Sequence, residues 1–384
     1  SVNEVISQFP EVLKDKIGSV KGFEHCIKLS PNAKPIVHKV RPIPFSVRED
    51  LKSMLKSLCN EGIITPTDSS SWVAPIVIAR KKCGEIRLCA DLRSLNKHIV
   101  VDCHPIPKIQ DLLANLGDAK IFSLIDLRSA YHQVQLSKES QDLTTFVTPF
   151  GAYKFLRLPF GLASAASVFQ KLMDNLFGDM PGVQAYQDDI LLFAKDESTH
   201  NKILKKVLNI LNSKGMTIKR NKCKFGVLEL EYLGHRITQE GIKPKESLIK
   251  ALSEAPPPKD RDALRSFLGL AEYYARFVHE YSLVVVPLRA LLKKGVKYEW
   301  TEKQSKAFEE IKKLIINAPA LVPFSHEHTC IITVDASLNG LGAVLAQNSS
   351  HNHKSQTVAF ASRALLPCEI VPLREKHWHV HGLL

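Results

Sequence analysis

The sequence lacks the features of several protein classes. None of its hydrophobic runs approaches the roughly 18 residues that a membrane-spanning helix needs. Its eight cysteines form no C-x-x-C pair and keep no regular spacing, which favours reduced, mostly packed thiols over a disulfide framework. With 18 glycines and 21 prolines in 384 residues, the chain is neither collagen-like nor dominated by linkers. Charged residues interrupt the first twenty positions, so no secretory signal peptide is predicted.

What is present is an ordinary globular composition with a basic balance. Hydrophobic residues make up 45% and charged residues 24%, which excludes a disordered chain. At roughly 150 residues per domain, the length predicts two or three domains. Lys and Arg number 52 against 39 for Asp and Glu, so the formal net charge is +13. This excess favours an anionic partner, most commonly nucleic acid, although basic chains without such a partner are also plentiful.

The hydrophobic pattern of the first two thirds predicts alternating helices and strands. Residues 1–45, with five prolines, are expected to form a largely extended lead-in. The remaining elements, in order, are a helix from a capping box at Ser46–Glu49 to Gly62, a hairpin with a basic tip over 72–90, a strand over 120–126, a helix over 164–177, a hairpin over 184–193, and a helix over 199–211 closed by Gly215.

The pattern changes after Gly241. A proline linker at 255–259 precedes short helical segments that continue to Pro323. One of these helices is expected to begin at Thr301, with Gln304 completing a capping box. From Thr329 the alternation predicts strands over 330–335 and 341–345. The fold class is therefore α+β and multidomain.

Three carboxylates stand where a sheet would bring them together. Asp126 ends an apolar strand, and Asp188 and Asp189 occupy the bend of a later hairpin. If the two elements are neighbours, the carboxylates converge and need cations, because like charges raise one another's pKa. Mg²⁺ suits such oxygen ligands, and two such ions can assist an in-line phosphoryl transfer. Taken alone, the Asp-Asp pair is more typical of plain turn chemistry.

Adjacent side chains of a strand point to opposite faces. Asp188 and Asp189 can therefore both face the metals only if the bend breaks this alternation.

Two basic clusters, at 202–206 and 219–224, are equally typical of solvated faces and of phosphate contacts.

Six motifs in chain order resemble those of reverse transcriptases from gypsy-type LTR retrotransposons. Tyr186-Gln-Asp-Asp189 resembles the Y-x-D-D motif of this family. Phe122–Gln133 is similar to the first catalytic motif, and Leu158–Leu162 with Val168–Gln170 is similar to the motif between the first catalytic motif and Y-x-D-D. Tyr232–His235 with Gly241-Ile242 is similar to the primer grip. Leu264–Phe277 is similar to the tether, and Thr333–Leu345 is similar to the start of an RNase H domain.

The resemblance implies a set of site residues. Asp126, Asp188 and Asp189 are the expected catalytic and metal-binding carboxylates, with the Leu127 carbonyl as an extra ligand for two Mg²⁺ ions. The expected contacts to the incoming dNTP are Lys81, Lys82, Arg87, Tyr131, Phe160 and Gln170. Tyr131, five residues after Asp126, matches the aromatic gate at the sugar 2′ position and so indicates deoxynucleotides. The expected primer grip is Leu233, Gly234 and His235.

The end of the chain departs from the family pattern. Asp335 and Glu375 are the candidate carboxylates of an RNase H remnant, and the later acidic residues of that domain are missing. A set of histidines at 351, 353, 377, 379 and 381 is expected to be exposed or drifted rather than a zinc site. Cys83 and Ala166 replace residues usual in the family, with small expected effect.

Together these patterns predict a right-hand polymerase of fingers, palm and thumb, followed by a connecting region and a truncated RNase H-like α/β domain. The expected divisions are 1–45 (lead-in after an upstream polyprotein region), 46–240 (fingers and palm), 241–325 (thumb and connecting region) and 326–384 (partial RNase H). The last division is expected to be loosely ordered or to lean on the connecting region. The start at Ser1 rather than Met predicts a piece of a longer polyprotein.

The predicted function is RNA-directed DNA synthesis by two-metal phosphoryl transfer, with an inactive RNase H part. The expected partners are an RNA or DNA template-primer and dNTPs, with no membrane. The sequence is compatible with a homodimer and with association with other Pol polyprotein products. The expected location is the cytoplasm, within retrotransposon particles. The alternatives are a decayed copy that binds nucleic acid without catalysis and a host-adopted structural protein, for which no feature argues.

Overall fold

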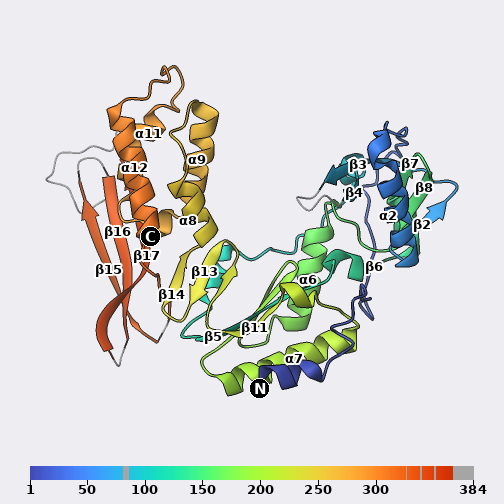
Figure 1. Cartoon of the computed structure of the whole chain (residues 1–384), viewed down its shortest axis with the longest axis horizontal. Helices are drawn as coiled ribbons and strands as arrows, with labels where there is room; N and C mark the ends of the chain where they lie inside the picture. Colours follow the sequence, from blue (N-terminus) through green and yellow to red (C-terminus); the bar gives the residue numbers. More distant parts are fainter. Residues whose placement is uncertain (81–85, 326, 338–339, 350–351, 366–384) are drawn as a thin grey trace. The chain divides into compact units, whose positions relative to one another are not determined.

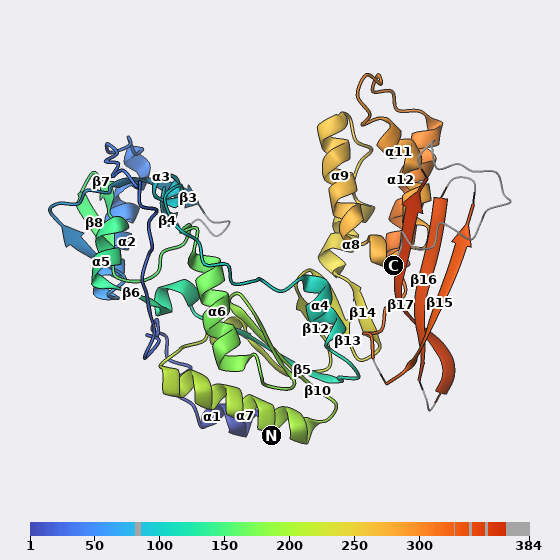
Figure 2. The same cartoon turned by 180° about the vertical axis from the view of Figure 1, so that it is seen from behind.

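The chain divides into two units in the computed structural model, which describes residues 1–384 except 81–85, 326, 338–339, 350–351 and 366–384 (Figures 1 and 2). The first unit comprises Ser1–Lys108 and Ile121–Val227, and the second comprises Ile109–Lys120 and Leu228–Leu384. Among the described residues, no helix has both the length and the apolar character for crossing a bilayer. The expected domain borders at 45, 240 and 325 stay predictions.

The first unit contains both of the motifs that carry the predicted carboxylates. Its elements are α1 (Val2–Ser7), β1 (Glu24–His25), η1 (Phe45–Val47), α2 (Arg48–Asn60), β2 (Ile64–Thr67), β3 (Ala74–Arg80), β4 (Ile86–Ala90), α3 (Arg93–Asn96), β5 (Ile121–Asp126), η2 (Ala130–Gln133), β6 (Gln135–Leu136), α5 (Lys138–Leu143), β7 (Phe146–Thr148), β8 (Gly151–Phe155), α6 (Ala165–Phe177), β9 (Val183–Tyr186), β10 (Asp189–Ala194), α7 (Glu197–Lys214), η3 (Arg220–Lys222) and β11 (Lys224–Val227).

A four-stranded sheet of order β11-β5-β10-β9 forms the centre of this unit. β10 pairs antiparallel with both β5 and β9. Figures 1 and 2 show α6 on one face of the sheet and α7 on the other. The buried faces of these helices are apolar, and burial of each large apolar side chain contributes about 1.5–3 kcal/mol. They comprise Val168, Phe169, Leu172, Met173 and Phe177 of α6, and Leu204, Val207, Leu208 and Leu211 of α7.

The ends of α7 follow local rules that the sequence contains. The Asp196 side chain accepts a hydrogen bond from the Thr199 amide at 2.9 Å, which caps the N-terminus. Gly215 ends the helix at φ 70°, a left-handed conformation that glycine adopts without steric cost. The predicted helix over 199–211 is thus confirmed and extends slightly at both ends.

A five-stranded sheet of order β2-β8-β7-β3-β4 forms the other part of the first unit. The predicted hairpin is present as β3 and β4, which pair antiparallel from Ile76 with Ala90 to Arg80 with Ile86. The predicted capping box at Ser46–Glu49 is wrong. Residues 45–47 form a 3₁₀ turn, and α2 begins at Arg48 without a side-chain cap.

The lead-in is less extended than predicted. Its first residues form α1, which packs against α7 (Figure 1). Ile6, Phe9 and Val12 are buried in the core of the first unit. The prolines that suggested an extended segment lie mostly after residue 30, so they do not oppose a helix at the start.

The second unit consists of helices between two small sheets. Its elements are α4 (Ile109–Ala114), β12 (Leu230–Tyr232), β13 (His235–Thr238), β14 (Gly241–Pro244), α8 (Glu246–Ser253), α9 (Arg261–Tyr273), η4 (Ala275–Phe277), α10 (Tyr281–Val284), α11 (Val286–Ala290), α12 (Glu302–Ile316), β15 (Thr329–Ala336), β16 (Gly340–Ser349) and β17 (Asn352–Ala364). β12, β13 and β14 form one antiparallel sheet, and β15, β16 and β17 form the other.

The C-terminal sheet includes a strand that the sequence did not indicate. β15 and β16 match the predicted strands, and β17 adds a third antiparallel neighbour. The sheet contacts the preceding helices, because Ser282 of α10 bonds Ser362 of β17 and the His279 ring packs edge-on against Phe360 at 5.7 Å. These contacts agree with the expectation that this region leans on the connecting region. The capping box of Thr301 and Gln304 at the start of α12 is confirmed.

Candidate active site

The predicted carboxylates meet at one end of the four-stranded sheet. Asp126 is the last residue of β5, Asp189 is the first residue of β10, and the two are directly opposed in the antiparallel ladder. Asp188 lies in the turn before β10, and its carbonyl accepts a hydrogen bond from the Leu127 amide at 3.1 Å. The sheet register therefore brings residues 63 positions apart in the chain to one place.

The turn between β9 and β10 has an unusual backbone. Gln187 has φ 55°, in the left-handed region that non-glycine residues rarely adopt. This conformation interrupts the extended backbone between Tyr186 and Asp189, so the strict alternation of a strand does not apply to the two aspartates. The bend that the paired carboxylates required is present.

Burial and like charge act on Asp189. Desolvation, followed by the negative charges of Asp188 and Asp126, raises the pKa of the Asp189 carboxyl to about 6, while Lys222 opposes the shift. A nearby cation stabilises the ionised form of a carboxyl group in this environment, because it offsets both the lost hydration and the repulsion between carboxylates. The electrostatics of the site therefore suit a bound metal ion.

Lys222 already supplies one positive charge. Its Nζ lies 3.2 Å from Asp126 Oδ2 and donates a hydrogen bond to it. Among the described residues, no three His, Cys, Asp or Glu side chains are gathered closely enough to hold a metal as they stand. Binding of one ion by all three carboxylates would therefore require them to turn toward it and the contact between Asp126 and Lys222 to open. Sequence reasoning placed Lys222 only in a basic cluster.

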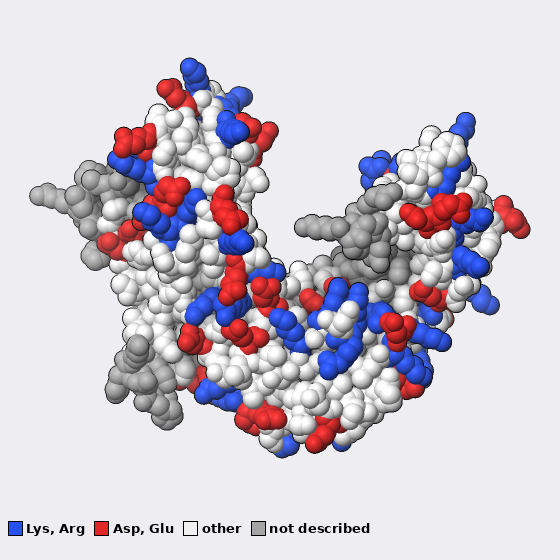
Figure 3. Space-filling view, viewed as in Figure 1, with Lys and Arg blue, Asp and Glu red and all other residues white. Residues whose placement is uncertain are grey.

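The segment around Lys222 is attached to the end of β5. The Lys219 amide donates to the Asp126 carbonyl at 2.8 Å, and the Asp126 amide donates to Cys223 Sγ at 3.3 Å. Burial raises the pKa of the Cys223 thiol to about 11, so it stays protonated near neutral pH. Figure 3 shows a group of Lys and Arg side chains on the visible face of this unit.

Tyr131 lies beside the turn that carries the aspartates. Its ring centroid is 5.1 Å from that of Phe160 and 5.4 Å from that of Phe169. Its hydroxyl donates to Gln187 Oε1 at 2.7 Å. Burial, followed by the charge of Asp188, raises the pKa of the Tyr131 hydroxyl. Phe160 thus packs against the predicted gate, which is hydrogen-bonded to the turn that carries the aspartates.

Gln170 braces the hairpin from α6. Its side chain is completely buried, and its Nε2 donates to the Ala185 carbonyl and to Asp174 Oδ1, each at 2.9 Å. Its Oε1 accepts from the Gln187 amide at 3.0 Å. Asp174 Oδ2 also lies 2.6 Å from His104 Nε2. These hydrogen bonds brace the hairpin, whereas the predicted nucleotide contact of Gln170 stays a prediction. No sequence pattern identified His104 or Asp174.

The basic fingertip residues are only partly described. Arg87 lies in β4, where its backbone pairs with Ala79 of β3. Lys81 and Lys82 lie outside the described residues. Their predicted contacts with a triphosphate stay predictions.

The predicted primer grip belongs to the second unit. Leu233 and Gly234 form a turn between β12 and β13, with φ 47° and 79°. Two tyrosines at the end of α9 hold this turn, since Tyr273 donates to the Leu233 carbonyl at 2.6 Å and Tyr274 to the Gly234 carbonyl at 2.7 Å. Burial lowers the pKa of His235 to about 4, so this histidine is neutral at pH 7.

The candidate RNase H carboxylates differ from those of the first unit. Asp335 lies near the end of β15 and is exposed, opposite Gly342 of β16. Glu375 lies outside the described residues. Within the part of the chain that the structure describes, Asp335 therefore has no carboxylate opposite it.

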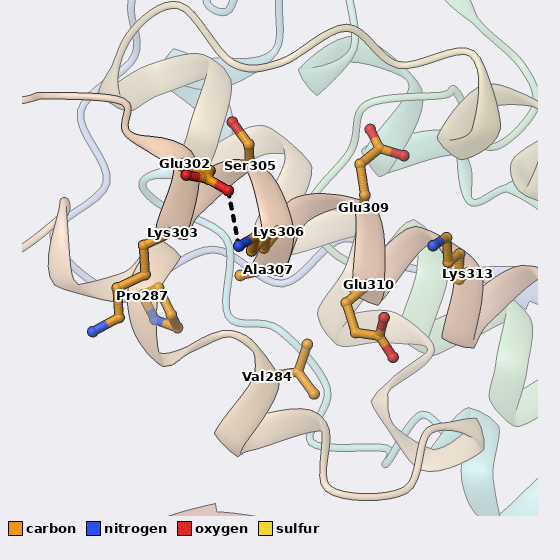
Figure 4. A pocket seen from close by; sticks show the side chains of 10 residues that line it. All are labelled: Val284, Pro287, Glu302, Lys303, Ser305, Lys306, Ala307, Glu309, Glu310 and Lys313. Atoms are coloured by element: carbon orange, nitrogen blue, oxygen red, sulfur yellow. Dashed lines mark ion pairs between the residues drawn. The ribbon is translucent and has the colours of Figure 1, made fainter.

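An open groove of about 720 Å³ runs along α12 beside Val284 and Pro287 (Figure 4). Acidic and basic side chains alternate along it, and Glu302 pairs with Lys306 at 2.8 Å. Such a mixture is typical of a solvated helix face.

Known proteins match this chain over most of its length. A family model described as "Reverse transcriptase (RNA-dependent DNA polymerase)" matches residues 78–237, and one described as "RNase H-like domain found in reverse transcriptase" matches residues 300–376. The chain therefore contains a reverse transcriptase domain, with an RNase H-like segment after it.

Its relatives are Pol polyproteins of LTR retrotransposons. The retrovirus-related Pol polyprotein from transposon 412 of Drosophila melanogaster is 35% identical over 338 residues, which is 86% of this chain and 27% of that protein. The Pol polyprotein from transposon 297 of the same species is 32% identical, over 91% of this chain and 33% of its own length. The Tf2-3 polyprotein of Schizosaccharomyces pombe is 31% identical, over 85% and 25%. The chain thus spans about a quarter to a third of these relatives.

Solved structures share the fold. The foamy viral protease-reverse transcriptase in complex with dsDNA has a TM-score of 0.87 at 24% identity, over 96% of this chain and 77% of that chain. The same enzyme in complex with an RNA/DNA hybrid has a TM-score of 0.82 at 23% identity, over 96% and 50%. The predicted right-hand polymerase fold, with mixed α and β content and a C-terminal RNase H-like part, is confirmed.

Proposed function

We propose that this chain extends the 3′ end of a primer with dNTPs on an RNA or DNA template. The observation that carries the proposal is the register of β5 and β10, which opposes Asp126 to Asp189 beside Asp188. The matched family supports the same activity. Because the reaction is a phosphoryl transfer, the protein contributes positioning and charge neutralisation rather than covalent chemistry.

Two Mg²⁺ ions are the proposed cofactors. The raised pKa of Asp189 supports a cation at this place, because burial and two neighbouring carboxylates destabilise its charge. Asp126, Asp188, Asp189 and the Leu127 carbonyl would hold the ions. When bound, the ions would stabilise the attacking and leaving oxygens of the transfer. The residues of the chain would hold the ions and orient the nucleotide beside the Tyr131 ring.

The proposed partners are a template-primer and dNTPs. A net charge of +13 and the group of Lys and Arg side chains in Figure 3 support binding of nucleic acid phosphates. Relatives of the fold were solved with dsDNA and with an RNA/DNA hybrid. Lys81, Lys82 and Arg87 are proposed to bind the triphosphate, and Leu233, Gly234 and His235 to contact the primer.

The cellular context is proposed from the relatives. As part of a Pol polyprotein of the gypsy type, the chain would act in cytoplasmic retrotransposon particles, as a homodimer or with other Pol products. The RNase H part of this chain is proposed to be inactive, because two-metal hydrolysis needs several carboxylates and Asp335 has no carboxylate opposite it among the described residues.

Primer extension tests the proposal. The purified chain is incubated with a labelled DNA primer on an RNA and on a DNA template, with dNTPs and Mg²⁺. Extension on both templates that stops on chelation by EDTA is expected. Tight binding of the template-primer without extension would instead favour a decayed copy that binds nucleic acid without catalysis.

A further inference from the structure

The predicted gate is bonded to the turn that carries the aspartates. The Tyr131 hydroxyl donates to Gln187 Oε1 at 2.7 Å, across 56 positions of the chain. We propose that Gln187, the variable residue of the Y-x-D-D motif in this chain, is a specificity-determining positioning residue that holds the Tyr131 ring at the sugar 2′ position. This inference rests on the proposed function.

The backbone of Gln187 supports a dedicated role. A non-glycine residue with φ 55° persists only where its surroundings hold it, since that conformation carries a steric cost. Two contacts hold it here. The buried Gln170 side chain accepts from the Gln187 amide at 3.0 Å, and the Tyr131 hydroxyl binds the Gln187 side chain. The strained turn thus directs the side-chain amide group of Gln187 toward the Tyr131 hydroxyl.

The packing of Tyr131 shows what this bond adds. Phe160 and Phe169 contact its ring at centroid distances of 5.1 and 5.4 Å. Aromatic contacts of this kind tolerate tilting, because several ring arrangements have similar energies. The hydroxyl bond acts at the far end of the ring and is directional. It therefore restricts the tilt by which the ring would make room for a ribose 2′-hydroxyl.

The donor and acceptor are well matched for this purpose. A tyrosine hydroxyl carries its proton at neutral pH, so Tyr131 is available as the donor. Gln187 is partly buried, and its amide oxygen is a neutral acceptor beside Asp188. A methionine at this position has a similar length and no comparable acceptor. The substitution Gln187→Met therefore removes the bond with little change in volume.

A double-mutant cycle tests the proposal. Tyr131→Phe, Gln187→Met and the double variant are compared with the wild type by the rNTP/dNTP ratio of kcat/KM. Each single variant is expected to raise the ratio by about three- to tenfold, the effect of losing one partly buried hydrogen bond. The double variant is expected to raise it no further than the larger single effect, because both substitutions remove one bond.

A matched control uses a tyrosine outside the site. Tyr153 of β8 stacks on Phe146 at 5.9 Å. Tyr153→Phe alone is expected to leave the rNTP/dNTP ratio at the wild-type value. In combination with Gln187→Met it is expected to leave the ratio at the value of Gln187→Met. A steric effect of methionine alone would appear in Gln187→Met and multiply with that of Tyr131→Phe.

The outcomes separate this inference from the function beneath it. Extension with dNTPs by the wild type, together with unchanged ratios in the single variants or multiplied effects in the double variant, overturns the role of Gln187 alone. Absence of extension overturns the proposed function and the specificity role with it. Melting temperatures of the same four proteins then test the contact: equal losses in all three variants support it, and additive losses contradict it.

Discussion

Two regions of this chain present an aspartate on a strand next to a turn, and they differ in what surrounds it. In the first unit, Asp126 and Asp189 face each other across two strands, and the pKa of Asp189 rises to about 6 because of burial and neighbouring carboxylates. In the C-terminal sheet, Asp335 is exposed and lies opposite Gly342. The comparison teaches that a single carboxylate on a strand can match a sequence motif. A metal-dependent active site needs several carboxylates gathered where water is partly excluded.

The supporting layers explain the difference. β5 and β10 lie between α6 and α7, and the side chains of β10 are mostly buried. The side chains of β15 are exposed along nearly its whole length, including Ile332 and Val334. A sheet covered on both faces can hold repelling charges at the ends of its strands, because burial of its apolar side chains offsets the electrostatic cost. An uncovered strand offers no such compensation.

The largest expected effect breaks the stronger of the two sites. Asp126→Asn or Asp188→Asn removes a proposed metal ligand and is expected to lower primer extension by about three orders of magnitude or more, since losing about 4 kcal/mol of charge stabilisation has that effect. Asp189→Asn is expected to be milder. Template-primer binding, measured by fluorescence anisotropy, should survive. Asp179→Asn, at an exposed turn, is the control. Near wild-type extension by Asp126→Asn would refute the assignment.

The second prediction concerns the weaker site directly. This chain is expected not to cut the RNA strand of a hybrid efficiently, because two-metal hydrolysis requires several carboxylates and none lies opposite Asp335 among the described residues. The measurement is gel analysis of a labelled RNA–DNA hybrid incubated with Mg²⁺. Asp335→Asn is expected to leave polymerase activity unchanged. Prompt cleavage that disappears in Asp335→Asn would show that the two regions are equally competent.

A third prediction tests the neighbourhood that only the first unit has. Tyr131→Val opens space at the sugar 2′ position and is expected to raise the rNTP/dNTP ratio of kcat/KM by about tenfold or more, the range that steric discrimination reaches. Single-nucleotide incorporation on a defined template provides the ratio. An unchanged ratio would mean that Tyr131 is not the gate, whatever its distance from the carboxylates.

A fourth prediction uses the raised pKa of Asp189. Between its ordinary pKa of 3.8 and its folded value of about 6, the folded protein keeps a proton that the unfolded chain releases. Stability attributable to this group therefore falls as pH rises from about 4 to about 6, and the penalty is complete at pH 7. Asp189→Asn removes the penalty and is expected to raise the melting temperature at pH 7 by about 2–4 °C.

At about pH 3 the two proteins should melt together, because this pH lies below both the unfolded and the folded pKa of Asp189 and the carboxyl is then largely protonated in both states. Mg²⁺ is expected to stabilise the wild type more than the variant, since a ligand stabilises the state that binds it. A lower melting temperature for Asp189→Asn at pH 7 would indicate that the carboxylate is already neutralised, for example through Lys222, and that the site does not store this repulsion.

The smallest expected effect concerns the attachment of the C-terminal sheet. Ser362→Ala removes the acceptor of the Ser282 amide and keeps the bond from the Ser282 hydroxyl to the Ser362 carbonyl. The loss is expected to be about 1 kcal/mol. Hydrogen exchange should accelerate in β17, and amides of β5 and β10 should keep their rates. Equal acceleration in β5 would contradict the independence of the two regions.

Much of the fold could be predicted from the sequence because its signals are local. The helix α7 has an apolar face at helical spacing, an Asp196 cap and a terminal Gly215. The strand β5 is an apolar run, and the hairpin β9–β10 encloses a polar bend. The failures are also local in origin. Ser46 and Glu49 have the spacing of a capping box, yet the turn at 45–47 places the helix start elsewhere.

The sequence by itself predicted, through its resemblance to reverse transcriptases, which aspartates belong to the polymerase motifs. Only the tertiary structure decided that Asp126 opposes Asp189, that Lys222 pairs with Asp126 across 96 positions, and that Gln187 accepts the Tyr131 hydroxyl. The physical reason is that these partners are set by strand register and by the packing of helices on a sheet. Both arise from contacts between distant segments, which no local periodicity encodes.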